Sequence, residues 1–278
     1  MKIPLEDEFA DIIRKATSGR DLSVTALSRQ TGIPLGRVEA VLEGNYDSGI
    51  VGRLAKYLEL DAECLFELAK GSWYPEPVEL DGLAAFNTPF PIRGYEEMTV
   101  NSYLVWDPTS KKAAAFDTGA NVDGMLEVIR EKGLKLTMVC LTHKHDDHIA
   151  ALPQLLEATG NPPLYACSYE PYKGAELFDP GKIMFLGYLQ IETCLTNGHS
   201  PGGTTYVISG LGRPVAIVGD SLFCCSQGGA NDHFKMALEN NRRHILSLPE
   251  ETVLCPGHGP MTSVAEELEH NPFFASRS

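Results

Sequence analysis

Hydrophobic positions in the first 70 residues recur at helical spacing and are interrupted by glycine and by capping side chains. Phe9, Ile12, Ile13 and Ala16 share one face of a first helix. Serine or aspartate before a helix, proline at its first position and glycine after its end are typical boundary signals. These signals predict four more short helices: from Ser23 to Gly32, from Pro34 to Gly44, from Ile50 to Leu58 and from Asp61 to Gly71. Residues 1–70 are therefore predicted to form a small helical domain.

The pattern changes after residues 71–78, a proline-containing stretch that is typical of a semi-rigid linker. Short runs of apolar and β-branched residues then alternate with segments of helical spacing. Such alternation predicts an α/β domain over residues 79–278. The predicted strands are 99–105, 113–117, 136–141, 204–209 and 214–218, and the predicted helices are 122–132 and 149–158.

Composition limits the classes of function. The chain has 278 residues, 43% of them hydrophobic, and a net charge of −14, which disfavours general binding to nucleic acid or to an anionic membrane. It has no apolar run of the ~20 residues that span a bilayer and no secretory pattern after Met1. Its seven cysteines are an odd number without paired spacing. We therefore expect a cytoplasmic protein with reduced thiols and no membrane partner.

Five of the eight histidines fall within motifs that also carry aspartate or glycine. His143, His145 and His148 belong to a His-x-His-x-Asp-His motif, and His199 and His258 each follow a glycine. The motifs, in order, are Thr142–His148, Gly198–Gly202, Val218–Ser221 and Pro256–Pro260. Imidazole and carboxylate together form a ligand set suited to zinc, iron or manganese.

The order and flanks of these motifs resemble those of the metallo-β-lactamase superfamily, over roughly the last 200 residues. Within it, the glyoxalase II-like hydrolases are the most similar group. The resemblance implies a four-layer αβ/βα sandwich with its site at one edge, between two sheets. It also implies two divalent metal ions, zinc first and iron or manganese as alternatives. The implied ligands are His143, His145 and His199 for the first metal, Asp147, His148 and His258 for the second, and Asp220 between the two.

The same resemblance implies the reaction. Metal-activated water would hydrolyse a small thioester, ester or lactone, with Asp147 or Asp220 accepting the released proton. Asp117, in the sequence Phe116-Asp117-Thr118-Gly119, would orient a ligand histidine and would not itself bind metal. The glycines beside His199, Asp220 and His258 are expected to let the backbone approach the metals closely.

Differences between this sequence and the motifs of other branches of the superfamily indicate a small-molecule substrate. Aspartate at position 220 disfavours lactamases that use cysteine there, and His145 in place of glutamate disfavours the di-iron oxygen reductases. The stretch from Asp220 to His258 is too short for the extra domain of the nucleic-acid-cleaving branch. Only residues 261–278 follow the last motif, so the basic C-terminal domain of glyoxalase II proper has no counterpart. The remaining candidate contacts for a substrate carboxylate are Lys144, Lys235, Arg242 and Arg243.

Two other functions stay open. One is a persulfide dioxygenase that holds a single iron through His143, His199 and Asp220. The segment from Gly198 to Tyr206 resembles that group as well. The other is a metal-binding transcriptional regulator or sensor, in which the helical domain binds a partner or an operator.

The helical domain resembles the helix-turn-helix domain of phage repressors over about residues 5–70. However, residues 1–70 contain 9 Lys plus Arg against 12 Asp plus Glu. The helix expected to enter a DNA groove offers only Arg37, beside Glu39 and Glu43. Because phosphate contacts dominate DNA affinity, these carboxylates favour a dimerisation or docking module over DNA binding. A homodimer formed through this domain also stays open.

Overall fold

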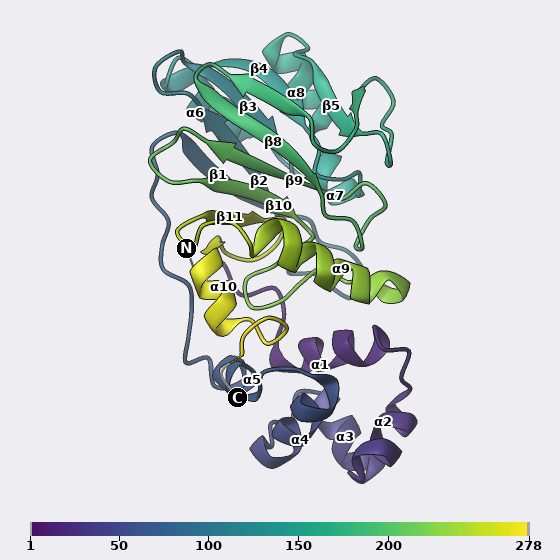
Figure 1. Cartoon of the computed structure of the whole chain (residues 1–278). Helices are drawn as coiled ribbons and strands as arrows, with labels where there is room; N and C mark the ends of the chain where they lie inside the picture. Colours follow the sequence, from purple (N-terminus) through teal and green to yellow (C-terminus); the bar gives the residue numbers. More distant parts are fainter. Residues whose placement is uncertain (1, 277–278) are drawn as a thin grey trace.

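The structure is a computed structural model that describes residues 2–276 and consists of a helical region beside a two-sheet sandwich (Figure 1). The helical region contains the five predicted helices. Two caps are those expected: the Ser23 side chain accepts from the N–H of Ala26 at 3.1 Å, and Asp61 accepts from that of Cys64 at 3.0 Å. Pro34 precedes the third helix as its N-cap and is not its first residue. The helices are α1 (Phe9–Ser18), α2 (Val24–Thr31), α3 (Leu35–Leu42), α4 (Ser48–Leu58) and α5 (Ala62–Lys70).

The sandwich contains two sheets of six strands each. The first has the order β1-β2-β3-β4-β5-β6 and the second the order β12-β11-β10-β9-β8-β7. The first comprises β1 (Leu83–Pro89), β2 (Thr99–Trp106), β3 (Lys112–Phe116), β4 (Lys135–Cys140), β5 (Leu164–Cys167) and β6 (Glu176–Phe178). The second comprises β7 (Ile183–Leu186), β8 (Leu189–Leu195), β9 (Thr204–Ser209), β10 (Val215–Gly219), β11 (Val253–Pro256) and β12 (Thr262–Ser263). Every predicted strand is present, and the α/β sandwich is confirmed.

Helices cover the outer faces of both sheets. On the first sheet lie α6 (Asp123–Glu131), α7 (Asp146–Ile149) and α8 (Leu152–Thr159). The helix predicted over 149–158 is therefore divided, because the chain turns at Ala150 and Ala151. Near the second sheet lie η1 (Asn231–His233), α9 (Phe234–Asn240), η2 (Asn241–Ile245) and α10 (Val264–His270). Within residues 2–276 every helix is too short or too polar to cross a bilayer.

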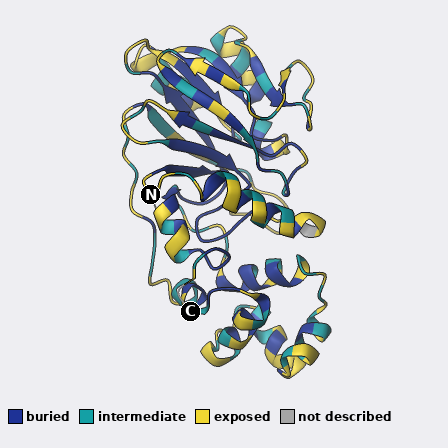
Figure 2. Ribbon diagram, in the orientation of Figure 1, coloured by how far each residue is buried: buried dark blue, intermediate teal, exposed yellow. Residues whose placement is uncertain are grey.

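Three groups of buried side chains account for the layers. One lies between the two sheets and includes Phe116 and Tyr206, whose rings meet edge to face at 5.2 Å. A second lies between the first sheet and helices α6 and α8. The strands between these groups are buried along most of their length (Figure 2). The interior of the sandwich therefore positions the loops at the ends of its strands.

The third group joins the helical region to the sandwich. It contains Ile12 and Leu54 from the helical region, Val218 from the second sheet, and Phe234 and Phe273 from the C-terminal half. A Cβ atom added at Gly19, directly after α1, would lie 2.2 Å from Cγ of Phe234. The hydrophobic core is thus continuous across residue 70, and the helical region packs against α9 and the C-terminal segment, which lie between it and the second sheet (Figure 1).

Candidate metal centre

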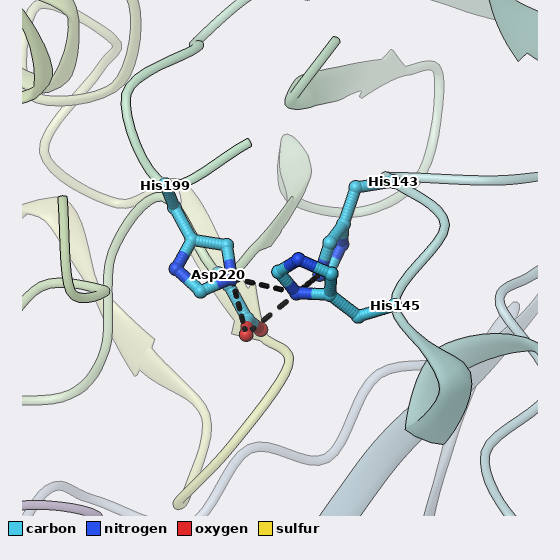
Figure 3. A group of neighbouring side chains, drawn as sticks. All are labelled: His143, His145, His199 and Asp220. Atoms are coloured by element: carbon cyan, nitrogen blue, oxygen red, sulfur yellow. Dashed lines mark hydrogen bonds and ion pairs between the residues drawn. The ribbon is translucent and has the colours of Figure 1, made fainter. Parts of the chain in front are cut away.

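Four side chains converge where β4, β8 and β10 end (Figure 3). His143 and His145 follow β4, His199 lies in the loop between β8 and β9, and Asp220 directly follows β10. Nδ1 of His145 lies 3.0 Å from Nε2 of His143 and 3.0 Å from Nε2 of His199. Oδ2 of Asp220 lies 3.3 Å from Nε2 of His199. The sequence grouped these histidines, and the structure brings them together.

A second cluster lies beside the first and consists of Asp147, His148 and His258. Oδ2 of Asp147 lies 3.3 Å from Nε2 of His258 and 3.8 Å from Nε2 of His148. Asp220 faces this cluster too, with Oδ1 3.2 Å from His148 Nε2 and Oδ2 3.4 Å from His258 Nε2. Asp147 and His148 lie inside the short helix α7, which begins at Asp146, earlier than the predicted helix. Asp220 therefore lies between the clusters, as expected.

The outward nitrogens of four histidines are held by oxygen atoms. Nδ1 of His258 donates to the carbonyl of Thr99 at 2.7 Å, and Nδ1 of His199 donates to that of Gly229 at 2.9 Å. Nδ1 of His143 lies 3.0 Å from Oγ1 of Thr142. Because a neutral imidazole has one N–H, such bonds leave the lone pair of Nε2 directed at the centre.

Asp117 holds the fourth histidine and also fixes the loop that carries His143. Its Oδ2 accepts from Nδ1 of His148 at 2.8 Å and from Oγ1 of Thr142 at 2.7 Å, and its Oδ1 accepts from the N–H of Thr142 at 2.8 Å. Its backbone has a left-handed φ of 55°, directly after β3. The structure thus places Asp117 behind the histidines, where the sequence expected it. The sequence did not predict that Thr142 connects Asp117 to His143, because a single threonine has no motif that indicates such a role.

Two glycines allow the backbone to approach the centre closely. A Cβ atom at Gly257, beside His258, would lie 2.0 Å from Oδ1 of Asp220 and 2.6 Å from Cε1 of His148. A Cβ atom at Gly228 would lie 1.9 Å from the carbonyl oxygen of Asp220. A side chain at Gly257 would displace the carboxylate that joins the two clusters, and one at Gly228 would displace the backbone of Asp220.

Buried carboxylates set the charge of the centre. Burial raises the pKa of Asp220, but His258 and His148 hold it well below its usual value. Burial lowers the pKa of His258 and of His148, yet Asp220 and other nearby carboxylates raise the two values to about 11 and about 10. For His143, burial prevails and holds the pKa well below its usual value. The field that attracts protons to His148 and His258 also attracts metal cations.

The donor atoms fit a pair of divalent metals. Nε2 of His148 and Oδ1 of Asp220 are buried and lie 3.2 Å apart, but neither atom makes a hydrogen bond of acceptable geometry. Unpartnered buried polar atoms are costly unless a ligand satisfies them. Tetrahedral zinc with bonds of about 2.0 Å holds its nitrogen ligands about 3.3 Å apart, close to the 3.0 Å separations in the first cluster. The clusters are therefore suited to divalent metals.

A cleft of about 620 Å³ opens onto both clusters. Besides the clusters it is lined by Tyr95, Met98 and Phe223, none of which the sequence had indicated. The helical region also contributes to it, with Glu6, Asp7, Glu8, Asp11 and Lys15. No periodicity or motif connects these residues to the histidines, because only the packing of α1 against the sandwich brings them there.

The basic side chains expected near the substrate lie elsewhere. Lys235, Arg242 and Arg243 line a separate cavity of about 480 Å³, which they share with Arg20 and Glu59 of the helical region. Lys144 is exposed and does not line the cleft. Among the described residues that line the cleft, Lys15 is the one basic side chain.

Residues 95–258 match the family model described as the metallo-beta-lactamase superfamily, and this range includes both clusters. The chain belongs to the metallo-beta-lactamase superfamily. The match leaves the helical region outside it. Two curated superfamily hydrolases are similar to this chain over somewhat more than half of its length. A probable metallo-hydrolase of Bacillus subtilis, YqgX, is 31% identical over 57% of this chain and 85% of its own. The hydroxyacylglutathione hydrolase GloC of Haemophilus influenzae is 26% identical over 68% of this chain and 97% of its own.

A solved superfamily structure shows the same fold. The B3 metallo-beta-lactamase BLEG-1 aligns with a TM-score of 0.58 and 26% identity, over 69% of this chain and 100% of its own. The names of GloC and BLEG-1 state different substrates, and that of YqgX states none. Together with the two clusters, they indicate a superfamily hydrolase with a site suited to divalent metals, and they leave its substrate open.

Proposed function

We propose that this protein is a metal-dependent hydrolase that cleaves a small thioester, ester or lactone. His143, His145 and His199 would hold one divalent metal, and Asp147, His148 and His258 a second, with Asp220 shared between them. Zinc is the first choice of metal, and iron or manganese are the alternatives. The observation that carries the proposal is the position of Asp220, whose two oxygens face both clusters.

The metals, when bound, would lower the pKa of water and polarise the bond to be cleaved. The residues of the chain supply orientation and proton transfer. Asp117 and Thr142 hold His148 and His143 in place. Asp147 lines the cleft and contacts only the second cluster, whereas Asp220 contacts histidines of both. Asp147 is therefore the better placed of the two carboxylates to accept the released proton.

The size of the cleft supports a small substrate. A volume of about 620 Å³ is in the range of pockets that hold small molecules. Lys15 is bonded to Asp7 and donates to the carbonyl of Gln227 at 2.8 Å. The cleft therefore offers an anionic thioester such as one of glutathione little basic surface, although the sequence of GloC is similar.

The test combines metal content with activity on a panel of thioesters, lactones and one chromogenic cephalosporin. We expect close to two metals per chain and turnover of a thioester or lactone. Asp220→Ala and His258→Ala should each reduce kcat/KM by more than about a hundredfold. His233→Ala, an exposed histidine outside both clusters, is the matched control and should keep full activity.

The other outcomes identify the alternatives. One iron per chain, with oxygen consumption on a persulfide and activity that survives His258→Ala, would establish the dioxygenase. Two metals without turnover of any substrate would favour a sensor. Full hydrolase activity in both Asp220→Ala and His258→Ala would contradict the proposal, because the second cluster would then have no part in the reaction.

A further inference from the structure

The N-terminal segment passes over the metal centre before it enters α1. Its backbone lies against the residue that follows His258, since a Cβ atom at Gly259 would be 3.3 Å from the nitrogen of Glu6. The hydroxyl of Tyr74 donates to the carbonyl of Ile3 at 2.7 Å, which ties the segment to the linker. In Figure 1 this purple segment runs from the sandwich down to α1.

Asp7 and Lys15 also fasten α1 to the loop that follows β10. The Lys15 ammonium pairs with Asp7, and Asp7 also accepts from the hydroxyl of Ser226. Lys15 lies 5.1 Å over the ring of Phe223, which in turn meets the ring of His258 edge to face at 5.5 Å. The helical region therefore forms a fixed wall of the cleft, and it is more than an attached domain.

The charges on this wall are unbalanced. Asp7 is neutralised by Lys15, and Asp11 is paired with Arg14 at 2.5 Å. Glu6 and Glu8 line the cleft, and neither forms a salt bridge within the described residues. The Glu8 side chain accepts from the N–H of Asp11 at the start of α1. Part of the Glu6 side chain is exposed, but burial of its carboxyl raises its pKa from 4.5 to about 7. The wall thus carries more carboxyl groups than basic side chains, and Glu6 is mostly ionised only above about pH 7.

The cleft is the site of the proposed reaction, because it opens onto both clusters. Asp220 in its floor is only 6% exposed, and its Oδ1 has no hydrogen-bond partner. We propose that Glu6 and Glu8 select substrates that carry a cationic group, such as an ammonium, next to the bond that is cleaved. This inference rests on the proposed hydrolase function and names its class of substrate. Opposite charges at a partly desolvated wall attract, and an anionic substrate would be repelled by the same carboxylates.

Two acetyl thioesters that differ in the charge of the thiol provide the test. Acetylthiocholine is cationic, and S-acetyl-3-mercaptopropionate is anionic. Water cleaves either to acetate and a free thiol, which a disulfide reagent reports. With the metal-loaded full chain at a pH above 7, where Glu6 is mostly ionised, we expect kcat/KM for the cationic thioester to exceed that for the anionic one by about tenfold or more, mainly through KM.

The variant Glu6→Gln/Glu8→Gln should reduce this preference by about tenfold and leave a neutral thioester, S-ethyl thioacetate, nearly unaffected. Glu39→Gln/Glu43→Gln, which removes two exposed carboxylates on and beside α3, is the control and should keep the preference. Equal metal content and melting temperature in all variants verify that the centre is intact. A preference that survives Glu6→Gln/Glu8→Gln would overturn the inference.

Calorimetry separates this inference from the proposed function. The non-hydrolysable thioethers S-ethylthiocholine and 3-(ethylthio)propionate are titrated into the same metal-loaded proteins. Tighter binding of the cation that depends on Glu6 and Glu8, without turnover of any substrate, would support the inference and contradict the hydrolase. Turnover without charge preference would contradict the inference and support the hydrolase. Failure of both probes to bind would also contradict the inference.

Discussion

Nδ1 of His148 donates a 2.8 Å hydrogen bond to Oδ2 of Asp117, a carboxylate that also holds Thr142 through both of its oxygens. Thr142 in turn contacts Nδ1 of His143. A single carboxylate at the end of β3 therefore orients one histidine of each cluster. Its effect on both clusters makes Asp117 a positioning residue, distinct from the groups that would bind metal.

The substitution Asp117→Asn tests this arrangement. It removes the charge and one acceptor, so His148 and Thr142 lose their common anchor. We expect metal affinity to fall by about 10- to 100-fold, as is usual for partners of metal-bound histidine. Competition with a chromophoric chelator measures it. Asp123→Asn, at an exposed position at the start of α6, is the control, and equal affinity in the two variants would contradict the prediction.

Gly257→Ala should disrupt the centre by steric conflict. Its Cβ atom would lie 2.0 Å from Oδ1 of Asp220, so either the backbone or the carboxylate has to move. We expect a loss of about 1–3 kcal/mol in the free energy of unfolding and binding of fewer than two metals. Gly36→Ala in α3 is the control, because its Cβ atom would meet nothing within 4 Å. Urea unfolding and elemental analysis would show whether the two variants differ.

The stability of the protein should depend on pH through Glu267. Burial raises the pKa of this carboxyl from 4.5 to about 7, although Asn271, Thr262 and the N–H of Cys225 donate to it. The folded state thus holds the proton more tightly than the unfolded state between these values. The free energy of unfolding should therefore fall as pH rises from 4.5 to 7, by about 3 kcal/mol.

Urea unfolding of the wild type and of Glu267→Gln at several pH values measures this contribution. The difference between the two proteins should change across that window and stay constant above it. Glu250→Gln, at an exposed position, should give a constant difference at every pH. A constant difference for Glu267→Gln as well would show that its pKa is ordinary.

Removal of metal should lower the melting temperature. The buried atoms His148 Nε2 and Asp220 Oδ1 would then lose the ligand that satisfies them. A metal present at about 100 times its Kd stabilises a site by about 2.7 kcal/mol, so zinc added to chelated protein should restore the transition. In Asp220→Ala most of this increase should be lost. A melting temperature that neither chelator nor zinc changes would argue against metal binding.

The helical region should not bind DNA with affinity that depends on Arg37. This guanidinium pairs with Asp47 at 2.6 Å, and Glu39 and Glu43 are exposed nearby. We expect genomic fragments to show no shift at 150 mM salt, because so few cations face the phosphates. Binding that weakens steeply with salt, and that Arg37→Ala abolishes, would contradict this and restore the operator-binding alternative.

Local signals in the sequence were sufficient for many elements. The caps Ser23 and Asp61 and the glycines at positions 32 and 71 place four helix boundaries within a residue or so, because each boundary depends on neighbouring backbone atoms. The strands around the histidines follow from their apolar runs. Shorter strands such as β6 were missed, since their pairing depends on partners rather than on their own pattern.

The metal centre also has features that the sequence predicts and features that depend on tertiary packing. The sequence by itself determined which side chains could bind metal, because the chemistry of imidazole and carboxylate is intrinsic to the residue and the motifs are distinctive. The family resemblance had already implied that Asp220 lies between the two clusters. Only the tertiary structure decided that Thr142 connects Asp117 to His143 and that Glu6 lies over the cleft. These relationships join segments far apart in the chain. They arise from the packing of two sheets and α1 into a continuous core, which no local pattern encodes.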